Sequence, residues 1–130
     1  MERDKFLVII YELCLSIAAF YLMYYFHECG HFIAAKISGF KKITVGYTNR
    51  YFLKVPNEVN LDAKEISTIK HKKIKLFFTL ISGPALGIIP IIGAYHFSNM
   101  NFNISMFLLA GLYILVVCMG DYKEIVDLLK

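Results

Sequence analysis

Long apolar runs dominate the chain, and three of them approach the length of a membrane span. An α-helix rises about 1.5 Å per residue, so about 20 apolar residues cross a hydrocarbon core about 30 Å thick. The apolar character of the first run ends near Phe26, but its helix is predicted to continue to about Ser38. We therefore predict an all-α membrane protein with three transmembrane helices. Their expected ranges are about 6–38, 76–97 and 102–120.

The segment at about 39–75, between the first two spans, follows a different pattern. Apolar and polar residues alternate from Ile43 to Tyr47 and again from Tyr51 to Val55, as in half-buried β-strands. Thr48–Arg50 is expected to turn the chain between them. We predict a short β-hairpin-like insertion up to Pro56, followed by a helix that opens with a capping box, Asp62 and Glu65.

Charge predicts how the spans are oriented. Of the 14 Lys and Arg residues, 10 fall within 36–75, whereas 98–103 carries no charge. By the positive-inside rule, the 39–75 segment and the C-terminus are cytoplasmic and the N-terminus is outside. An anionic inner leaflet accounts for the net charge of +4, so we expect a lipid bilayer and no nucleic acid as partner.

The organisation is that of one domain. With 58% hydrophobic residues and no linker or repeat, residues 1–130 are predicted to form a single polytopic membrane domain, in a bacterial cell membrane. No small-residue cleavage site follows the first run, so we interpret it as a retained span. Glu12 lies near its outer end and is expected to reach the membrane interface.

The stretch His-Glu-Cys-Gly-His, residues 27–31, has the spacing of a zinc site. Residues four apart share one helix face, so His27 and His31 can bind one metal ion while Glu28 projects beside them. Ionisable groups at the end of an apolar span are costly, which favours function over a chance match. A catalytic zinc takes three protein ligands, so a third ligand must come from elsewhere.

Topology suggests where that ligand is. The first and third spans both run inward, so Asp121 is expected at the same depth as the two histidines. Glu124, one turn later, and Cys118, one turn earlier, are competing ligands. Asp121 is preferred because it lies at the apolar boundary, whereas Glu124 falls among charged residues.

The sequence resembles the site-2 protease family of intramembrane zinc metalloproteases, as a minimal three-span core. The resemblance rests on "FHECGHFIAAKISGF", on "LISGPALG" at 80–87 and on Gly120-Asp121. It departs from the family at Gly87, where an Asn is common, and in the order Met-Gly-Asp around the third ligand. The resemblance implies zinc at His27, His31 and Asp121.

We therefore expect a zinc metalloendopeptidase that cuts a membrane-inserted peptide near the cytoplasmic face, with Glu28 as general base. Gly83 and Pro84 are candidate substrate contacts; Gly83 with Gly87 can equally be a helix-packing pair. Tyr51 and Leu53 are candidates for binding substrate as an added strand. The alternative is a non-catalytic immunity or transporter-accessory protein that keeps the scaffold. Oligomeric state is left open.

Overall fold

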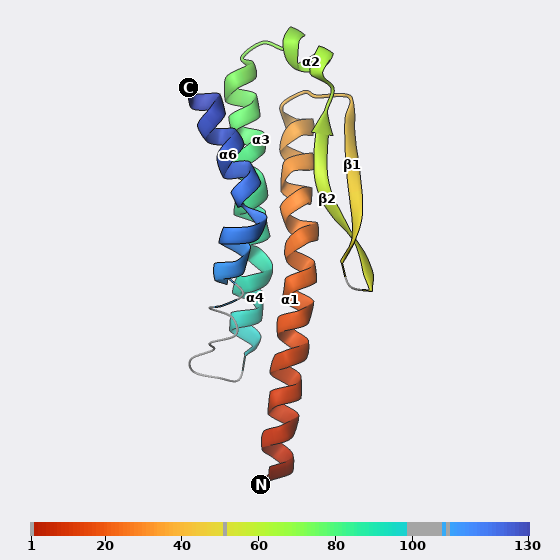
Figure 1. Ribbon diagram of the computed structural model, residues 1–130, viewed down its shortest axis with the longest axis vertical. Helices are drawn as coiled ribbons and strands as arrows, with labels where there is room; N and C mark the ends of the chain where they lie inside the picture. Colours follow the sequence, from red (N-terminus) through yellow and green to blue (C-terminus); the bar gives the residue numbers. More distant parts are fainter. Residues whose placement is uncertain (1, 51, 99–107, 109) are drawn as a thin grey trace.

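A computed structural model shows the chain as a helical assembly built around one long helix (Figure 1). The structure describes residues 2–50, 52–98, 108 and 110–130. The helices α3 and α4 run back along one side of α1, α6 returns beside α3, and a β-hairpin lies on the other side of α1 (Figure 1). The elements are α1 (Glu2–Ile37), β1 (Ile43–Arg50), β2 (Leu53–Leu61), α2 (Ala63–Thr68), α3 (Lys72–Gly87), α4 (Ile89–Phe97), the π-helical η1 (Tyr113–Val117) and α6 (Met119–Leu129).

Among the described residues, two helices are long and apolar enough to cross a membrane: α1, and the continuous stretch Lys72–Phe97 that comprises α3 and α4. The 36 residues of α1 correspond to about 54 Å of helix, more than one hydrocarbon core requires. The first two predicted spans therefore agree with the structure in length and composition. Residues 102–107 and 109 of the third, 102–120, lie outside the described residues, and the structure does not show this stretch as a span.

Helix α1 ends where Gly39 reverses the chain. Gly39 has a φ of +92°, a left-handed conformation that a residue without Cβ adopts easily. The Gly39 N–H donates to Lys36 O and the Phe40 N–H to Ala35 O, which satisfies two carbonyls of the last turn. This turn directs the following hairpin back along α1 (Figure 1).

The predicted hairpin is confirmed, with longer strands than expected. β1 and β2 pair antiparallel, from Ile43 opposite Leu61 to Arg50 opposite Leu53. Thr48–Arg50 therefore belongs to β1, and the predicted turn there is wrong. The register shifts between Gly46 and Tyr47, which leaves an extra residue on β2 next to Pro56. A bulge tolerates proline because the missing N–H is not needed in the ladder, so β2 continues past the expected end.

The predicted capping box is half right. Asp62 caps α2 by accepting the Lys64 N–H at 2.9 Å. Glu65 instead accepts the backbone N–H groups of Lys42 and Lys41, at 3.0 and 2.7 Å. These donors lower the pKa of the Glu65 carboxyl below its ordinary value. Glu65 thus ties α2 to the start of the hairpin rather than closing its own helix end.

Glu12 does not reach the membrane interface as expected, because it is buried at 6% exposure and accepts a hydrogen bond from Ser98 Oγ at 3.0 Å. Nearby, the Tyr11 hydroxyl donates to Phe97 O at 2.8 Å. Both contacts join the first half of α1 to the end of α4. The position of the Glu12 carboxylate is therefore explained by the packing of α1 against α4, not by contact with the membrane interface.

The core lies where α1 meets α4 and η1. Its buried members are Ala19, Met23, Ile91, Ala94 and Tyr113. Most large apolar side chains of α1 face outward instead, for example Phe6 at 63% and Ile9 at 64% exposure. An apolar outer surface of this kind suits lipid better than water.

Helices α1 and α3 pack closely against each other at Gly30. A Cβ added at Gly30 would collide with the backbone carbonyl of Ser82 and lie about 3.0 Å from the Gly83 Cα. We expect Gly30→Ala to destabilise the fold by about 1–3 kcal/mol, the usual cost of overpacking. Gly93→Ala is the matched control, because among the described residues no atom beyond its own helix backbone and chain neighbours lies within 4 Å of an added Cβ there. Thermal unfolding in detergent measures both; equal stability of the two variants would contradict the packing described here.

Candidate metal centre

The two histidines of the 27–31 motif lie one turn apart on α1 and face the interior. His27 and His31 are 2% and 6% exposed, and their ring centroids are 4.8 Å apart. The Nε2 atoms of the two rings lie 3.2 Å from each other. The i, i+4 spacing therefore produces the convergence that the sequence predicted.

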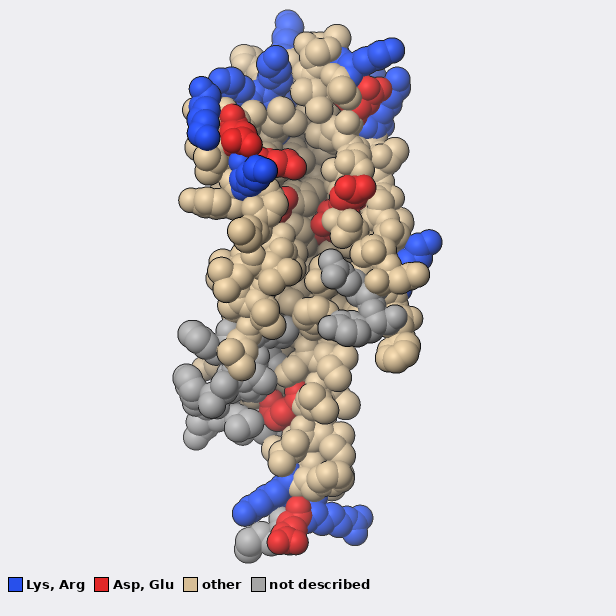
Figure 2. Space-filling view, in the orientation of Figure 1, with Lys and Arg blue, Asp and Glu red and all other residues tan. Residues whose placement is uncertain are grey.

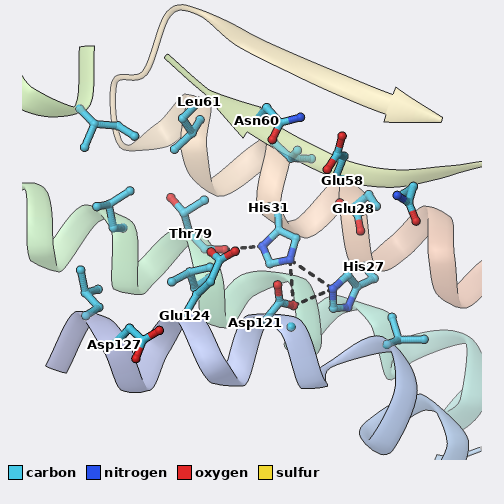
Figure 3. A pocket seen from close by; sticks show the side chains of 18 residues that line it. His27, Glu28, His31, Glu58, Asn60, Leu61, Thr79, Asp121, Glu124 and Asp127 are labelled. Atoms are coloured by element: carbon cyan, nitrogen blue, oxygen red, sulfur yellow. Dashed lines mark hydrogen bonds and ion pairs between the residues drawn. The ribbon is translucent and has the colours of Figure 1, made fainter. Parts of the chain in front are cut away.

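Asp121 completes this group from the start of α6. Its Oδ2 atom lies 2.7 Å from His27 Nε2 and 3.1 Å from His31 Nε2. His27, His31 and Asp121 together can hold a metal ion. Among the described residues, neither Glu124 nor Cys118 belongs to this group, although Glu124 lines the same cleft. Figure 3 shows the three side chains pointing toward one another.

The hydrogen bond at Nδ1 of each histidine indicates which of its ring nitrogens carries the proton. His31 Nδ1 lies 2.7 Å from the Thr79 carbonyl oxygen, which can only accept, so Nδ1 carries the proton. The Tyr113 hydroxyl donates to Pro84 O at 3.0 Å and thus accepts from His27 Nδ1–H at 2.9 Å. In a neutral imidazole the other nitrogen then has a free lone pair. Both Nε2 atoms are therefore free to bind a metal ion.

The donor set fits zinc. Two imidazole nitrogens and one carboxylate oxygen meet at one point, and when both imidazoles are neutral their lone pairs face the carboxylate, an arrangement that a cation would stabilise. Tetrahedral zinc with bonds of about 2.0–2.1 Å places its ligand atoms about 3.3 Å apart. The observed separations of 2.7, 3.1 and 3.2 Å require only small outward movements.

Glu28 lies beside this group and is 8% exposed. Within the part of the chain that the structure describes, no hydrogen-bond partner reaches its Oε2 atom. A buried carboxylate oxygen without a partner is costly, so it calls for a functional explanation. An oxygen in this position can accept a proton from a molecule that enters the site.

The site opens into a cleft of about 680 Å³ between α1, β2, α3 and α6. His27, Glu28, His31 and Asp121 line its floor, and residues 57–61 of β2 line one wall (Figure 3). This volume is within the range of sites that bind small molecules or short peptide segments. His27, Glu28 and His31 are thus buried, yet the cleft connects them with the outside.

The other predicted site residues, Gly83, Pro84, Tyr51 and Leu53, do not belong to the group of His27, His31 and Asp121. A Cβ at Gly83 would collide with the His31 ring, and one at Gly87 with the Tyr113 hydroxyl. Both glycines therefore make room for residues of the site, which supports the packing interpretation; a substrate contact at Gly83 or Pro84 stays a prediction. Leu53 is half exposed and does not line the cleft. Tyr51 lies outside the described residues.

Sequence reasoning did not identify Tyr113, which is 1% exposed and supports His27 from the far side of the ring. Its position in the π-helical turn η1, shortly before Asp121, brings it to the same site. A single tyrosine in an apolar run carries no spacing signal that would have revealed this role. A residue that orients a metal-bound histidine typically contributes 10–100-fold to metal affinity.

Tyr113→Phe removes only the hydroxyl. We expect zinc affinity to fall about 10–100-fold, because His27 Nδ1 loses its acceptor while the ring still fills the core. Competition with a zinc chelator measures this. Tyr95→Phe, an exposed tyrosine on α4, is the control and should bind zinc as the unmodified protein does. Unchanged affinity in Tyr113→Phe would contradict the supporting role.

Comparisons with protein-family models, with curated proteins and with solved structures found no match to this chain.

Proposed function

We propose that this protein is a zinc-dependent endopeptidase that cleaves a membrane-inserted peptide, similar in its chemistry to the site-2 proteases. The observation that supports this most strongly is the convergence of His27 Nε2, His31 Nε2 and Asp121 Oδ2 beside a buried, unpartnered Glu28 oxygen. These are the ligands and the base that zinc-dependent peptide hydrolysis requires.

Different residues of the chain would bind the metal ion, orient its ligands and transfer the proton. Zinc supplies Lewis acidity, which polarises a carbonyl and makes water a better nucleophile near neutral pH. His27, His31 and Asp121 would hold the ion, and Tyr113 and Thr79 orient the two imidazoles. Glu28 takes the proton from the attacking water and delivers it to the leaving amine.

The position of the site along α1 supports a substrate in the membrane. About 20 residues from Phe6 bring a helix across a hydrocarbon core, so His27 would lie near the far boundary. With the N-terminus outside, this boundary is cytoplasmic, and Lys and Arg side chains gather at the same end of the molecule (Figure 2). Water reaches a scissile bond there more easily than at the bilayer centre.

The substrate must be extended where it is cut, because helical carbonyls are engaged in backbone hydrogen bonds. We infer that β2 pairs with this extended segment by strand addition. In the described part of the chain, β2 is paired with β1 alone, and residues 57–61 line the cleft above Glu28. The edge that we propose for docking is therefore residues 57–61, which line the cleft, rather than Leu53, which does not.

Metal analysis and cleavage assays on the protein in detergent or nanodiscs test the proposal. We expect about one zinc per chain, and cleavage of a membrane-inserted peptide that a chelator abolishes and added zinc restores. Cleavage that persists without zinc would refute the proposed chemistry. Bound zinc with no cleavage of any membrane peptide would instead favour the non-catalytic immunity or accessory role.

A further inference from the structure

Three carboxylates near the metal centre have no part in the chemistry proposed above. Glu58 on β2 and Glu124 and Asp127 on α6 line the same cleft as Glu28 and Asp121 (Figure 3). The three-residue spacing from Asp121 to Asp127 places these α6 side chains on neighbouring positions of one helix face. Acidic side chains thus stand on opposite walls of the cleft.

This concentration of negative charge contrasts with the rest of the chain. The protein has 14 basic and 10 acidic residues, yet five of the ten acidic residues line this one cleft. No Lys or Arg is among the described residues that line it, although Lys130 Nζ lies 3.7 Å from Asp127, where both side chains are mostly exposed. Figure 2 shows acidic side chains gathered in a hollow on this face, below the basic end of the molecule. Carboxylates that face one another repel, so a cationic ligand stabilises such an arrangement.

A second observation indicates that the cleft receives a ligand. Glu28 is more than nine-tenths buried, lines the cleft and has an oxygen without a hydrogen-bond partner among the described residues. A molecule that enters the cleft can supply the hydrogen-bond donor that this oxygen lacks among the described residues. The neighbouring wall is the edge of β2, whose Glu58 lies next to the backbone that would hold an extended peptide.

We propose that the cleft selects membrane peptides that carry Lys or Arg beside the scissile bond, and that Glu58, Glu124 and Asp127 bind this cationic flank. The inference deepens the proposed function and rests on it. Peptides that span a membrane have an excess of Lys and Arg at their cytoplasmic ends, so the charge of the cleft matches the chemistry of such a flank. The basic end of the protein is left to contact anionic lipid.

Two synthetic membrane peptides test the proposal, identical except that one has three Lys and the other three Gln on the flank next to the scissile bond. At low ionic strength we expect kcat/KM to be about tenfold higher for the Lys peptide, since electrostatic steering raises association rates by about 10–10³. The preference should shrink as salt is added. The triple variant Glu58→Gln, Glu124→Gln, Asp127→Asn should cleave both peptides equally well.

A charge control separates local from general effects. Glu2→Gln with Asp4→Asn removes two carboxylates from the first turn of α1, at the opposite end of the molecule, and should keep the preference (Figure 1). Zinc content checks that the triple variant is folded. Equal cleavage of both peptides by the unmodified protein, or a preference that survives in the triple variant, would overturn the proposal.

Binding measurements keep this test independent of catalysis. Both peptides, labelled with a fluorophore, are titrated with the Glu28→Gln protein with and without the triple change. Tighter binding of the Lys peptide by about tenfold, lost with the triple change, supports the cationic-flank proposal even if no peptide is cut. Equal affinity for the two peptides refutes it, whether or not the proposed protease activity is found.

Discussion

Glu28→Gln is expected to lower the rate of peptide cleavage by about 10²–10⁴-fold while zinc remains bound. Gln has nearly the shape of Glu but cannot accept the proton of the attacking water. The metal ligands His27, His31 and Asp121 are untouched, so metal content should stay at about one zinc per chain. Rate and zinc content are measured on the same preparation.

Glu2→Gln serves as the control, because it makes the same chemical change at an exposed position in the first turn of α1. It should cleave at the rate of the unmodified protein. A Glu28→Gln protein that cleaved nearly as fast would eliminate the general-base role. Its buried oxygen would then need another explanation, such as a structural water.

Removal of any one metal ligand is expected to abolish both zinc binding and cleavage. His27→Ala, His31→Ala and Asp121→Asn each leave two protein ligands, too few for a stable catalytic zinc site. Zinc content should fall from about one per chain to near zero. The structure supports Asp121 as the third ligand, because its Oδ2 lies 2.7 and 3.1 Å from the two imidazoles.

Glu124→Gln and His96→Ala are the matched controls. Glu124 lines the cleft without belonging to the three-residue group, and His96 is exposed on α4. Both variants should retain zinc. Loss of zinc from Glu124→Gln, with retention in Asp121→Asn, would show that the third ligand has been assigned to the wrong carboxylate.

Local patterns accounted for features that depend on neighbouring residues. The lengths of the first two apolar runs predicted α1 and the stretch Lys72–Phe97, and alternation predicted the hairpin. The turn at Thr48–Arg50 was placed wrongly, because polar residues suit a turn and the exposed side of a strand equally well. The extension of β2 past Pro56 depended on a bulge, which only the pairing with β1 reveals.

Polar residues with distant partners were the hardest to interpret. Glu65 has the spacing of a capping box, yet its carboxylate binds the backbone of Lys41 and Lys42, which precede it by more than 20 residues. Glu12 was expected at the membrane interface and is buried against Ser98. In both cases, the hydrogen-bond partner is distant in the sequence, so no local pattern indicates it.

By itself, the sequence determined the chemistry that one helix can present. His27, Glu28 and His31 lie within five residues, and helical geometry alone places the two imidazoles on one face. Only the tertiary structure decided the rest of the site. The sequence already favoured Asp121 over Glu124, but the approach of Asp121 to both imidazoles depends on how α1 and α6 pack. The contacts of Tyr113 and Thr79 with the imidazoles, and the acidic walls of the cleft, likewise depend on the packing of α1, α3, α6 and β2. The physical reason is that these contacts join residues about 30 to 90 positions apart, whose distances no local periodicity encodes.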